Sequence, residues 1–225
     1  MKRLDYEQLS SLPLFLGIDG VTLTDLYETV SPVVSPMRRG TTIITEGEEC
    51  RSLVYVLEGQ TEAITNFGVG KFSIREYLRS KSVIEPQCLF GLHTTYTRTY
   101  TAVSPGYFFR IPKSVIVRDM MPNDVFRFNF INLLSSSLQD ALRRQRHLPA
   151  ATPEARLAEM VARQVIRPAG TIELKCKMWD IAPYLSVTRL NLSRMLHRYS
   201  DEGLLEMYRG GIVFPLFERF EARVR

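Results

Sequence analysis

The chain has 225 residues, 45% hydrophobic and 24% charged, a balance that excludes wholesale disorder and allows one large domain or two small ones. No apolar run approaches the length of a membrane span and the first residues do not form a signal peptide, so we expect a cytoplasmic protein that does not enter a membrane. The net charge of +5 lies in the second part, because residues 1–119 carry 13 basic and 13 acidic side chains, whereas residues 120–225 carry 16 and 11. Such a basic half fits either a solvated surface or attraction to a phosphate backbone.

The first 119 residues begin with a segment of helical pattern and continue as a β-rich region. Residues 1–31 place apolar side chains at helical spacing. From Val33 to Ile111, short runs rich in β-forming residues are separated by turn residues. The clearest runs are Thr41–Ile44, Leu53–Leu57, Glu62–Thr65, Tyr100–Val103 and Phe108–Ile111. Many short strands at this spacing predict a sandwich, a barrel or a jelly roll.

A long helix is predicted next, from Pro122 to about Arg146. A heptad-like spacing relates five of its residues, namely Ile131, Leu134, Leu138, Ala141 and Gln145. A helix this long and apolar needs two covering surfaces. One can be the β-rich part of the same chain, and the other the same helix of a second subunit. The alternative is a monomer whose helix packs only internally.

The remaining residues predict a smaller helical domain. A helix over Pro153–Ile166 and a short strand over Thr171–Lys175 precede two helices, Met178–Leu185 and Thr188–Ser200, joined by a turn. This is helix-turn-helix spacing. The second of these helices has an apolar stripe at helical spacing: Leu192, Met195, Leu196 and Tyr199. Two apolar runs around Arg209-Gly210-Gly211 then indicate a β-hairpin.

The face opposite that stripe has the chemistry of a nucleic-acid contact. No acidic residue occurs from Thr188 to Ser200, so this face can approach phosphate without repulsion. The candidate DNA-contacting residues are Thr188, Arg189, Leu190, Ser193, Arg194, His197 and Arg198, together with Arg209 in the hairpin. Arginine can bind guanine O6 and N7 with two hydrogen bonds. The alternative is an amphipathic surface helix with no nucleic-acid role.

This order of parts resembles the Crp/Fnr family of bacterial transcription regulators. Two segments carry the resemblance: Arg39–Glu48 followed by Leu53–Gly59, and the stretch from Asp180 to Leu196. It implies an α+β fold with a jelly-roll sensor domain at residues 1–119, a dimerisation helix at 120–148 and a winged helix-turn-helix domain at 150–225. It also implies a homodimer on a two-fold duplex DNA site under small-molecule control, and leaves RNA polymerase open as a further partner.

The resemblance assigns roles to several residues and shows departures at others. Arg189 and Arg194 match base-contacting arginines of the family, and Thr188 matches a hydroxyl residue that contacts phosphate. Leu190 stands where an acidic residue is frequent, and it cannot accept a hydrogen bond from cytosine N4, so we expect a different target sequence. Ser186 replaces a turn glycine.

The cyclic-nucleotide branch of the family holds its phosphate with a Gly-Glu pair and a later Arg-Ser or Arg-Thr pair. Counting back from Ala102 without gaps places Glu85-Pro86 and Tyr96-Thr97 at those positions. Glu85 would repel a phosphate and Pro86 has no N–H to donate, which disfavours cyclic AMP. The effector-pocket candidates are Glu85, Tyr96, Thr97 and Arg98, the last of which would reach the site only after a local shift, and the effector is unknown.

Other cofactors and other classes of protein fit less well. An iron-sulfur cluster is not expected because the first cysteine is Cys50, and a haem-dependent regulator of the same fold stays an alternative through His93 or Cys88. We expect no metal site and no enzyme, since the three histidines lie in three different elements and no catalytic motif occurs. A cupin-like metalloenzyme is the least favoured interpretation. Arg189 and Arg194 argue against a ligand-binding adaptor that does not bind DNA.

Overall fold

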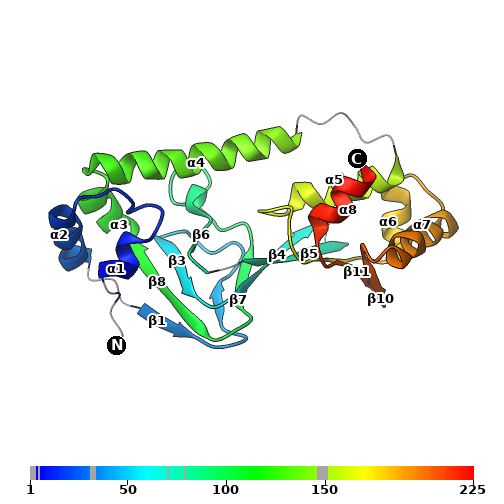
Figure 1. Ribbon diagram of the computed structural model, residues 1–225, viewed down its shortest axis with the longest axis horizontal. Helices are drawn as coiled ribbons and strands as arrows, with labels where there is room; N and C mark the ends of the chain where they lie inside the picture. Colours follow the sequence, from blue (N-terminus) through cyan, green and yellow to red (C-terminus); the bar gives the residue numbers. More distant parts are fainter. Residues whose placement is uncertain (1–3, 5, 31–33, 70, 79, 146–151) are drawn as a thin grey trace. The chain divides into compact units, whose positions relative to one another are not determined.

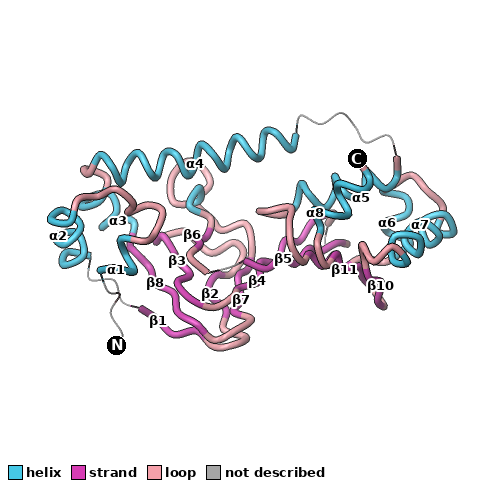
Figure 2. Tube along the Cα trace, viewed as in Figure 1, coloured by secondary structure: helices cyan, strands magenta, loops and turns pink. Residues whose placement is uncertain are grey.

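The computed structural model describes residues 4, 6–30, 34–69, 71–78, 80–145 and 152–225. The chain forms two compact units, the first comprising Met1–Thr61 and Leu78–Asp140, the second Glu62–Tyr77 and Ala141–Arg225. Helices and strands occur in both units (Figures 1 and 2). The predicted α+β class is therefore confirmed.

An antiparallel four-stranded sheet, in the order β1-β8-β3-β6, is the main layer of the first unit. Its strands are β1 (Val34–Met37), β3 (Ser52–Glu58), β6 (Ser82–Ile84) and β8 (Gly106–Pro112). The same unit contains β2 (Thr42–Ile44) and β7 (Thr99–Ala102), which pair with each other in antiparallel register. β3 is central in the sheet and is buried from Leu53 to Val56, which explains its continuous apolar run.

Aromatic side chains connect α4 to this sheet. The helices of the unit are α1 (Tyr6–Ser10), α2 (Gly20–Val30), α3 (Lys113–Val115), α4 (Asp124–Gln145), the 3-10 helix η1 (Pro86–Cys88) and the π-helix η2 (Ile116–Met120). The Phe15 ring lies 6.3 Å from that of Tyr55 in β3 and 5.6 Å from that of Phe126 in α4. Asn129 of α4 donates to the carbonyl oxygens of Leu14 and Leu16. The N-terminal half of α4 is thereby fixed to the first unit.

The second unit combines C-terminal helices with five neighbouring strands of one sheet. Its elements are α5 (Pro153–Gln164), β9 (Ile172–Lys175), α6 (Met178–Tyr184), α7 (Arg189–Asp201), β10 (Glu206–Tyr208), β11 (Gly211–Phe214) and α8 (Phe217–Val224). The hairpin strands β4 (Thr61–Phe67) and β5 (Phe72–Leu78) complete the sheet order β10-β11-β9-β5-β4. β5 pairs with β9 in antiparallel register, from Ser73 opposite Lys175 to Glu76 opposite Ile172. A hairpin from the early, β-rich part of the sequence thus belongs to the core of the second unit.

Polar groups reinforce the pairing of β5 with β9. Arg75 forms ion pairs with Glu62 in β4, Nε to Oε2 at 3.1 Å, and with Glu173 in β9, Nη1 to Oε2 at 2.9 Å. Glu76 is only 2% exposed. Its carboxylate accepts the backbone N–H groups of Ile166 at 2.7 Å and Arg167 at 3.2 Å. These donors follow the end of α5, so Glu76 fixes the segment that connects α5 to β9.

Most predicted elements are confirmed, and the differences are local. Each of the five predicted runs lies in a strand except for at most one residue at its end, and the long helix begins at Asp124, inside its predicted range. The first 31 residues contain two short helices, α1 and α2, where one helical stretch was predicted. β1, β5, β6 and α8 were not predicted. Among the described residues, no helix is both long and apolar enough to cross a membrane.

Candidate nucleic-acid interface

A tight turn between α6 and α7 determines where α7 begins. The Val187 N–H donates to the Ala182 carbonyl at 3.0 Å. Ser186 has a φ of 58°, in the left-handed region, which explains why a glycine is expected at this position. Thr188 then caps α7, because its hydroxyl accepts the Asn191 N–H at 3.2 Å. The helix therefore starts at Arg189, directly after the cap.

One face of α7 is buried in the core of the second unit. The buried residues are those of the predicted apolar stripe, Leu192, Met195, Leu196 and Tyr199. The Tyr199 ring packs edge-on against Phe220 of α8, with centroids 5.3 Å apart. Burial of large apolar side chains stabilises by roughly 1.5–3 kcal/mol each, so the core fixes the orientation of α7 about its own axis.

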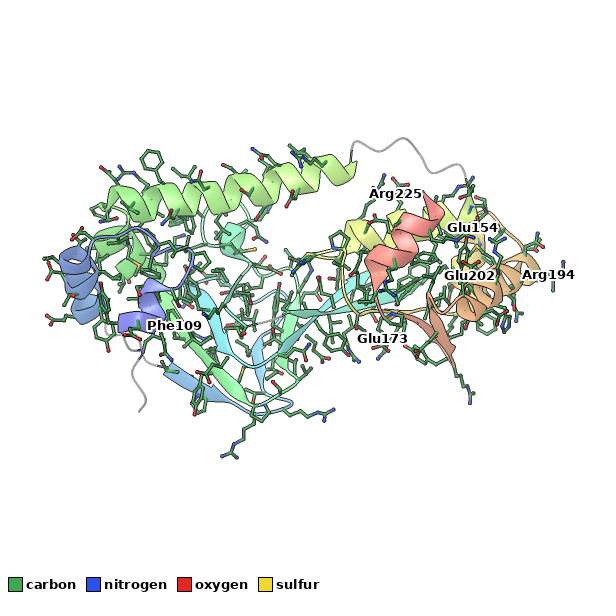
Figure 3. The ribbon with its side chains drawn as sticks, in the orientation of Figure 1. Phe109, Glu154, Glu173, Arg194, Glu202 and Arg225 are labelled. Carbon is green, nitrogen blue, oxygen red and sulfur yellow. The ribbon has the colours of Figure 1, made fainter. Side chains whose placement is uncertain are left out.

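The opposite face of α7 carries the predicted contact residues. Thr188, Arg189, Leu190, Arg194 and His197 are exposed and Ser193 is half-buried. Leu190, with 59% of its surface exposed, is an apolar side chain in water. Within the described part of the chain, neither Arg189 nor Arg194 forms an ion pair. Arg194 projects outward from the helix (Figure 3).

Arg198 differs from the other candidate arginines because its charge is paired. Its Nη2 atom lies 2.6 Å from Oε1 of Glu154, in the first turn of α5. Its guanidinium also lies 4.8 Å from the centre of the Tyr199 ring. No local pattern indicated this pair, since the two partners are 44 residues apart in the sequence. Arg198 ties α7 to α5, and its charge is less available to an external phosphate than that of Arg194.

The predicted hairpin follows α7 as the strands β10 and β11. Glu206 to Tyr208 pair with Val213 to Gly211, and Arg209 with Gly210 forms the connection. Gly210 has a φ of 94°, which favours glycine. Arg209 is exposed beside it. The helix-turn-helix is therefore followed by a two-stranded wing with a cation at its tip.

In the first unit, three of the four effector-pocket candidates meet at one buried carboxylate. Glu85 is 4% exposed, and its Oε2 accepts the Thr97 N–H at 2.7 Å while its Oε1 accepts the Thr97 hydroxyl at 2.9 Å. Arg98 Nη1 lies 3.6 Å from Oε1. Tyr96 is separate from this group, since its hydroxyl donates to the Ser52 carbonyl at 3.0 Å.

Two further members of this cluster were missed in the sequence. The Tyr100 hydroxyl donates to Glu85 Oε1 at 2.9 Å, and the Cys88 thiol lies 3.3 Å from Oε2. Burial, followed by the hydrogen bond and charge of Glu85, raises the pKa of Cys88 to about 12, so the thiol stays protonated. Tyr100 lies on the buried face of β7. A tyrosine hydroxyl on a buried strand face needs a partner, which is the signal that could have revealed it.

The residues considered for haem are placed differently from one another. His93 is exposed, whereas Cys88 is 3% exposed and faces Glu85. In the described ranges, no group of three or more His, Cys, Asp or Glu side chains is arranged to hold a metal ion.

The surface of α4 bears an apolar stripe. Ile131 and Leu138, from the predicted heptad set, are 50% and 59% exposed, whereas Leu134 and Ala141 are half-buried. The side chain of Gln145 lies outside the described residues. Phe128 and Leu142, 62% and 41% exposed, extend the stripe at the same 3–4 spacing. We call Phe128, Ile131, Leu138 and Leu142 the α4 seam.

Comparison with known proteins identifies one domain in the sequence and the fold of the chain. Residues 35–123 match the family model of the cyclic nucleotide-binding domain. No curated protein matches the sequence. The solved structures to which the chain is similar include a protein from Eubacterium rectale described as a transcriptional regulator of the Crp/Fnr family, at 20% identity and a TM-score of 0.56, covering 94% of this chain and 97% of that one.

Two further similar structures align with this chain over nearly all of their own length. Catabolite activator protein from Thermus thermophilus is 16% identical, with a TM-score of 0.52 over 95% of this chain and 100% of that one. The c-di-GMP-responsive global regulator CLP from Xanthomonas campestris is 17% identical, with a TM-score of 0.52 over 87% and 99%. The chain therefore has the fold of the Crp/Fnr transcription regulators, and the resemblance seen in the sequence is confirmed for the fold.

Proposed function

We propose that this chain is a sequence-specific DNA-binding transcription regulator of the Crp/Fnr type. The observation that carries the proposal is the outer face of α7, where Arg189 and Arg194 are exposed on a helix without acidic residues before Asp201. The opposite face of α7 is anchored in the core. Such a helix can enter the major groove, where each arginine can bind a guanine edge, while the Thr188 hydroxyl and Arg209 of the wing contact phosphate.

A homodimer on an inverted repeat follows from the α4 seam. An exposed apolar stripe at 3–4 spacing is the pattern by which two helices pack as a coiled coil. The same helix of a second copy matches this stripe by symmetry. Two copies present two α7 helices, which suit two half-sites about one helical turn apart.

We assign a different role to each of three consecutive parts of the chain. Residues 1–119 act as the sensor domain, residues 120–148 as the dimerisation helix and residues 150–225 as the DNA-binding domain. The β4–β5 hairpin, whose sequence lies within the first of these, packs with the C-terminal elements. Movement of this hairpin would therefore act directly on the sheet that supports α7.

Selection from random duplex DNA tests the proposal. The purified protein, without added ligand, is expected to enrich an inverted repeat, because two α7 helices read two symmetric half-sites. Base pairs facing Leu190 are expected to be degenerate, since leucine cannot accept from cytosine N4. Selections both with purified protein and in cell extract that enrich no symmetric site would contradict the proposal. Enrichment of a single, unrepeated half-site would retain DNA reading and reject the dimer.

A further inference from the structure

Glu85 is a buried anion that is almost completely enclosed by donors. Its side chain is 1% exposed, yet its two oxygens receive the Thr97 N–H, the Thr97 hydroxyl and the Tyr100 hydroxyl at 2.7–2.9 Å. The Cys88 thiol at 3.3 Å and the Arg98 guanidinium at 3.6 Å complete the shell. We call Cys88, Thr97, Arg98 and Tyr100 the anion cradle. A backbone N–H, hydroxyls and one guanidinium converging on two oxygens is also the chemistry that holds a phosphodiester.

The backbone of Glu85 gives a second, independent observation. Its φ of 37° and ψ of 56° lie in the left-handed region, which is less favourable for a residue with a side chain than for glycine. The ungapped register with the cyclic-nucleotide pattern places a glycine at this position. The glutamate therefore occupies a backbone conformation suited to glycine, and its carboxylate is held by the cradle despite that cost.

We propose that Glu85 is the built-in ligand of the anion cradle. Its carboxylate takes the place that an external monoanion, such as a phosphate or a phosphodiester, would otherwise fill. The sequence predicts only that Glu85 repels a phosphate. In the structure, the Glu85 carboxylate also accepts the hydrogen bonds that such a phosphate would need. While Glu85 is in place, the cradle has no donor shell to offer a cyclic nucleotide, and removal of the carboxylate creates an anion site. This inference concerns the first unit alone and does not depend on DNA binding.

A pair of substitutions separates occupancy of the cradle from a general effect of salt. Glu85→Gly removes the carboxylate and suits the backbone, whereas Glu85→Gln keeps the size and blocks the cradle. Glu49→Gln, at an exposed ion pair with Arg51 in the same unit, is the matched control for the lost charge. The probe is inorganic phosphate, and the readout is the Tm of each protein in phosphate against chloride of equal ionic strength.

We expect both Glu85 variants to melt below the wild type, because each leaves cradle donors without their carboxylate. Phosphate at about ten times its Kd should then raise the Tm of Glu85→Gly by about 2–4 °C more than it raises that of any other protein in the set. An equal phosphate shift in Glu85→Gly and Glu85→Gln would overturn the proposal.

The wild type and the glutamine variant keep the test decisive if Glu85→Gly does not fold. Glu85→Gln with the Tm of the wild type would show that the carboxylate is not held by the cradle, and would overturn the proposal. Calorimetric titration of the wild type with 3′,5′-cyclic AMP should give no saturable heat at millimolar concentration. Saturable binding that is weakened by Thr97→Val would place the nucleotide in the cradle and overturn it as well.

Discussion

The anion cradle and the outer face of α7 treat their charged groups in opposite ways. In the cradle, donors from one short stretch of chain and from β7 converge on the Glu85 carboxylate, which is sealed from water. On α7, Arg189 and Arg194 are exposed and form no ion pair in the described part of the chain. Donors that already have an acceptor are unavailable to a ligand, whereas exposed cations still attract one. The comparison predicts a chain that binds a large polyanion and not a small one.

The largest effect is expected from removing the exposed cations of α7. The double variant Arg189→Ala with Arg194→Ala should lose about 2–6 kcal/mol of binding to each half-site of the selected duplex, because each bidentate pair contributes about 1–3 kcal/mol. Fluorescence anisotropy at fixed salt measures this loss. Arg225→Ala removes a cation from an ion pair with Glu221 at the C-terminal end of α8 and should leave the affinity within a few-fold. Equal losses in both proteins would mean that α7 contributes only general charge.

Separating the two copies is expected to have the next largest effect. Ile131→Glu with Leu138→Glu places charges in the α4 seam, where both side chains are at least half exposed, so each chain should stay folded. Sedimentation should show a monomer, and affinity for the inverted repeat should fall by about 10²–10⁴, the gain that two linked sites provide. Val21→Glu, at a residue 75% exposed outside the seam, is the control. A dimer that survives the double substitution would refute the role of the seam.

A smaller effect is expected at the second enclosed carboxylate, Glu76. Glu76→Gln keeps the side chain's size but removes its charge. The hydrogen bonds from the Ile166 and Arg167 N–H groups become weaker because they then end on a neutral amide. We expect a loss of about 1–3 kcal/mol in the free energy of unfolding by urea. Glu206→Gln, exposed in β10 of the same sheet, should change it by less than about 0.5 kcal/mol. Equal losses would show that the enclosure of Glu76 has no energetic weight.

The buried face of α7 was predictable because it depends only on local periodicity. Leu192, Met195, Leu196 and Tyr199 repeat at the period of a helix, and the structure buries all four. The hairpin of the wing was predictable from an equally local signal, the Gly210-Gly211 pair between two apolar runs. In contrast, α8 was missed, since its two buried residues, Phe217 and Phe220, make too short a pattern in eight residues to predict a helix.

Contacts between distant segments could not be predicted from local pattern. Arg75 meets Glu173 across 98 residues, and nothing in the sequence near β5 identifies β9 as its partner. At Glu85, the sequence identified three members of the cluster but not the enclosure of the carboxylate. That enclosure depends on donors 12 and 15 residues further along the chain. Charge type can be read from a sequence, but whether a charge is enclosed depends on tertiary structure.

The smallest effect is expected at a carboxylate that is partnered but not enclosed. Glu218, in the first turn of α8, accepts the Gly170 N–H at 2.7 Å, and this backbone hydrogen bond is the main cause that lowers the pKa of Glu218. Because the folded-state pKa lies below the unfolded-state pKa, the stabilisation is present above the unfolded pKa and is lost as the pH falls through the folded pKa.

Glu218→Gln should therefore cost less than about 1 kcal/mol at pH 7, since the group is exposed. The difference from the wild type should vanish in acid, and urea unfolding across the acidic range measures it. A difference that persists below the pKa of the carboxyl would mean that the amide disturbs the start of α8, and that the charge itself contributes nothing. Agreement with the expected pH dependence would place Glu218 between the enclosed Glu85 and the exposed Arg189 and Arg194 of α7, as a charge that stabilises only while it is ionised.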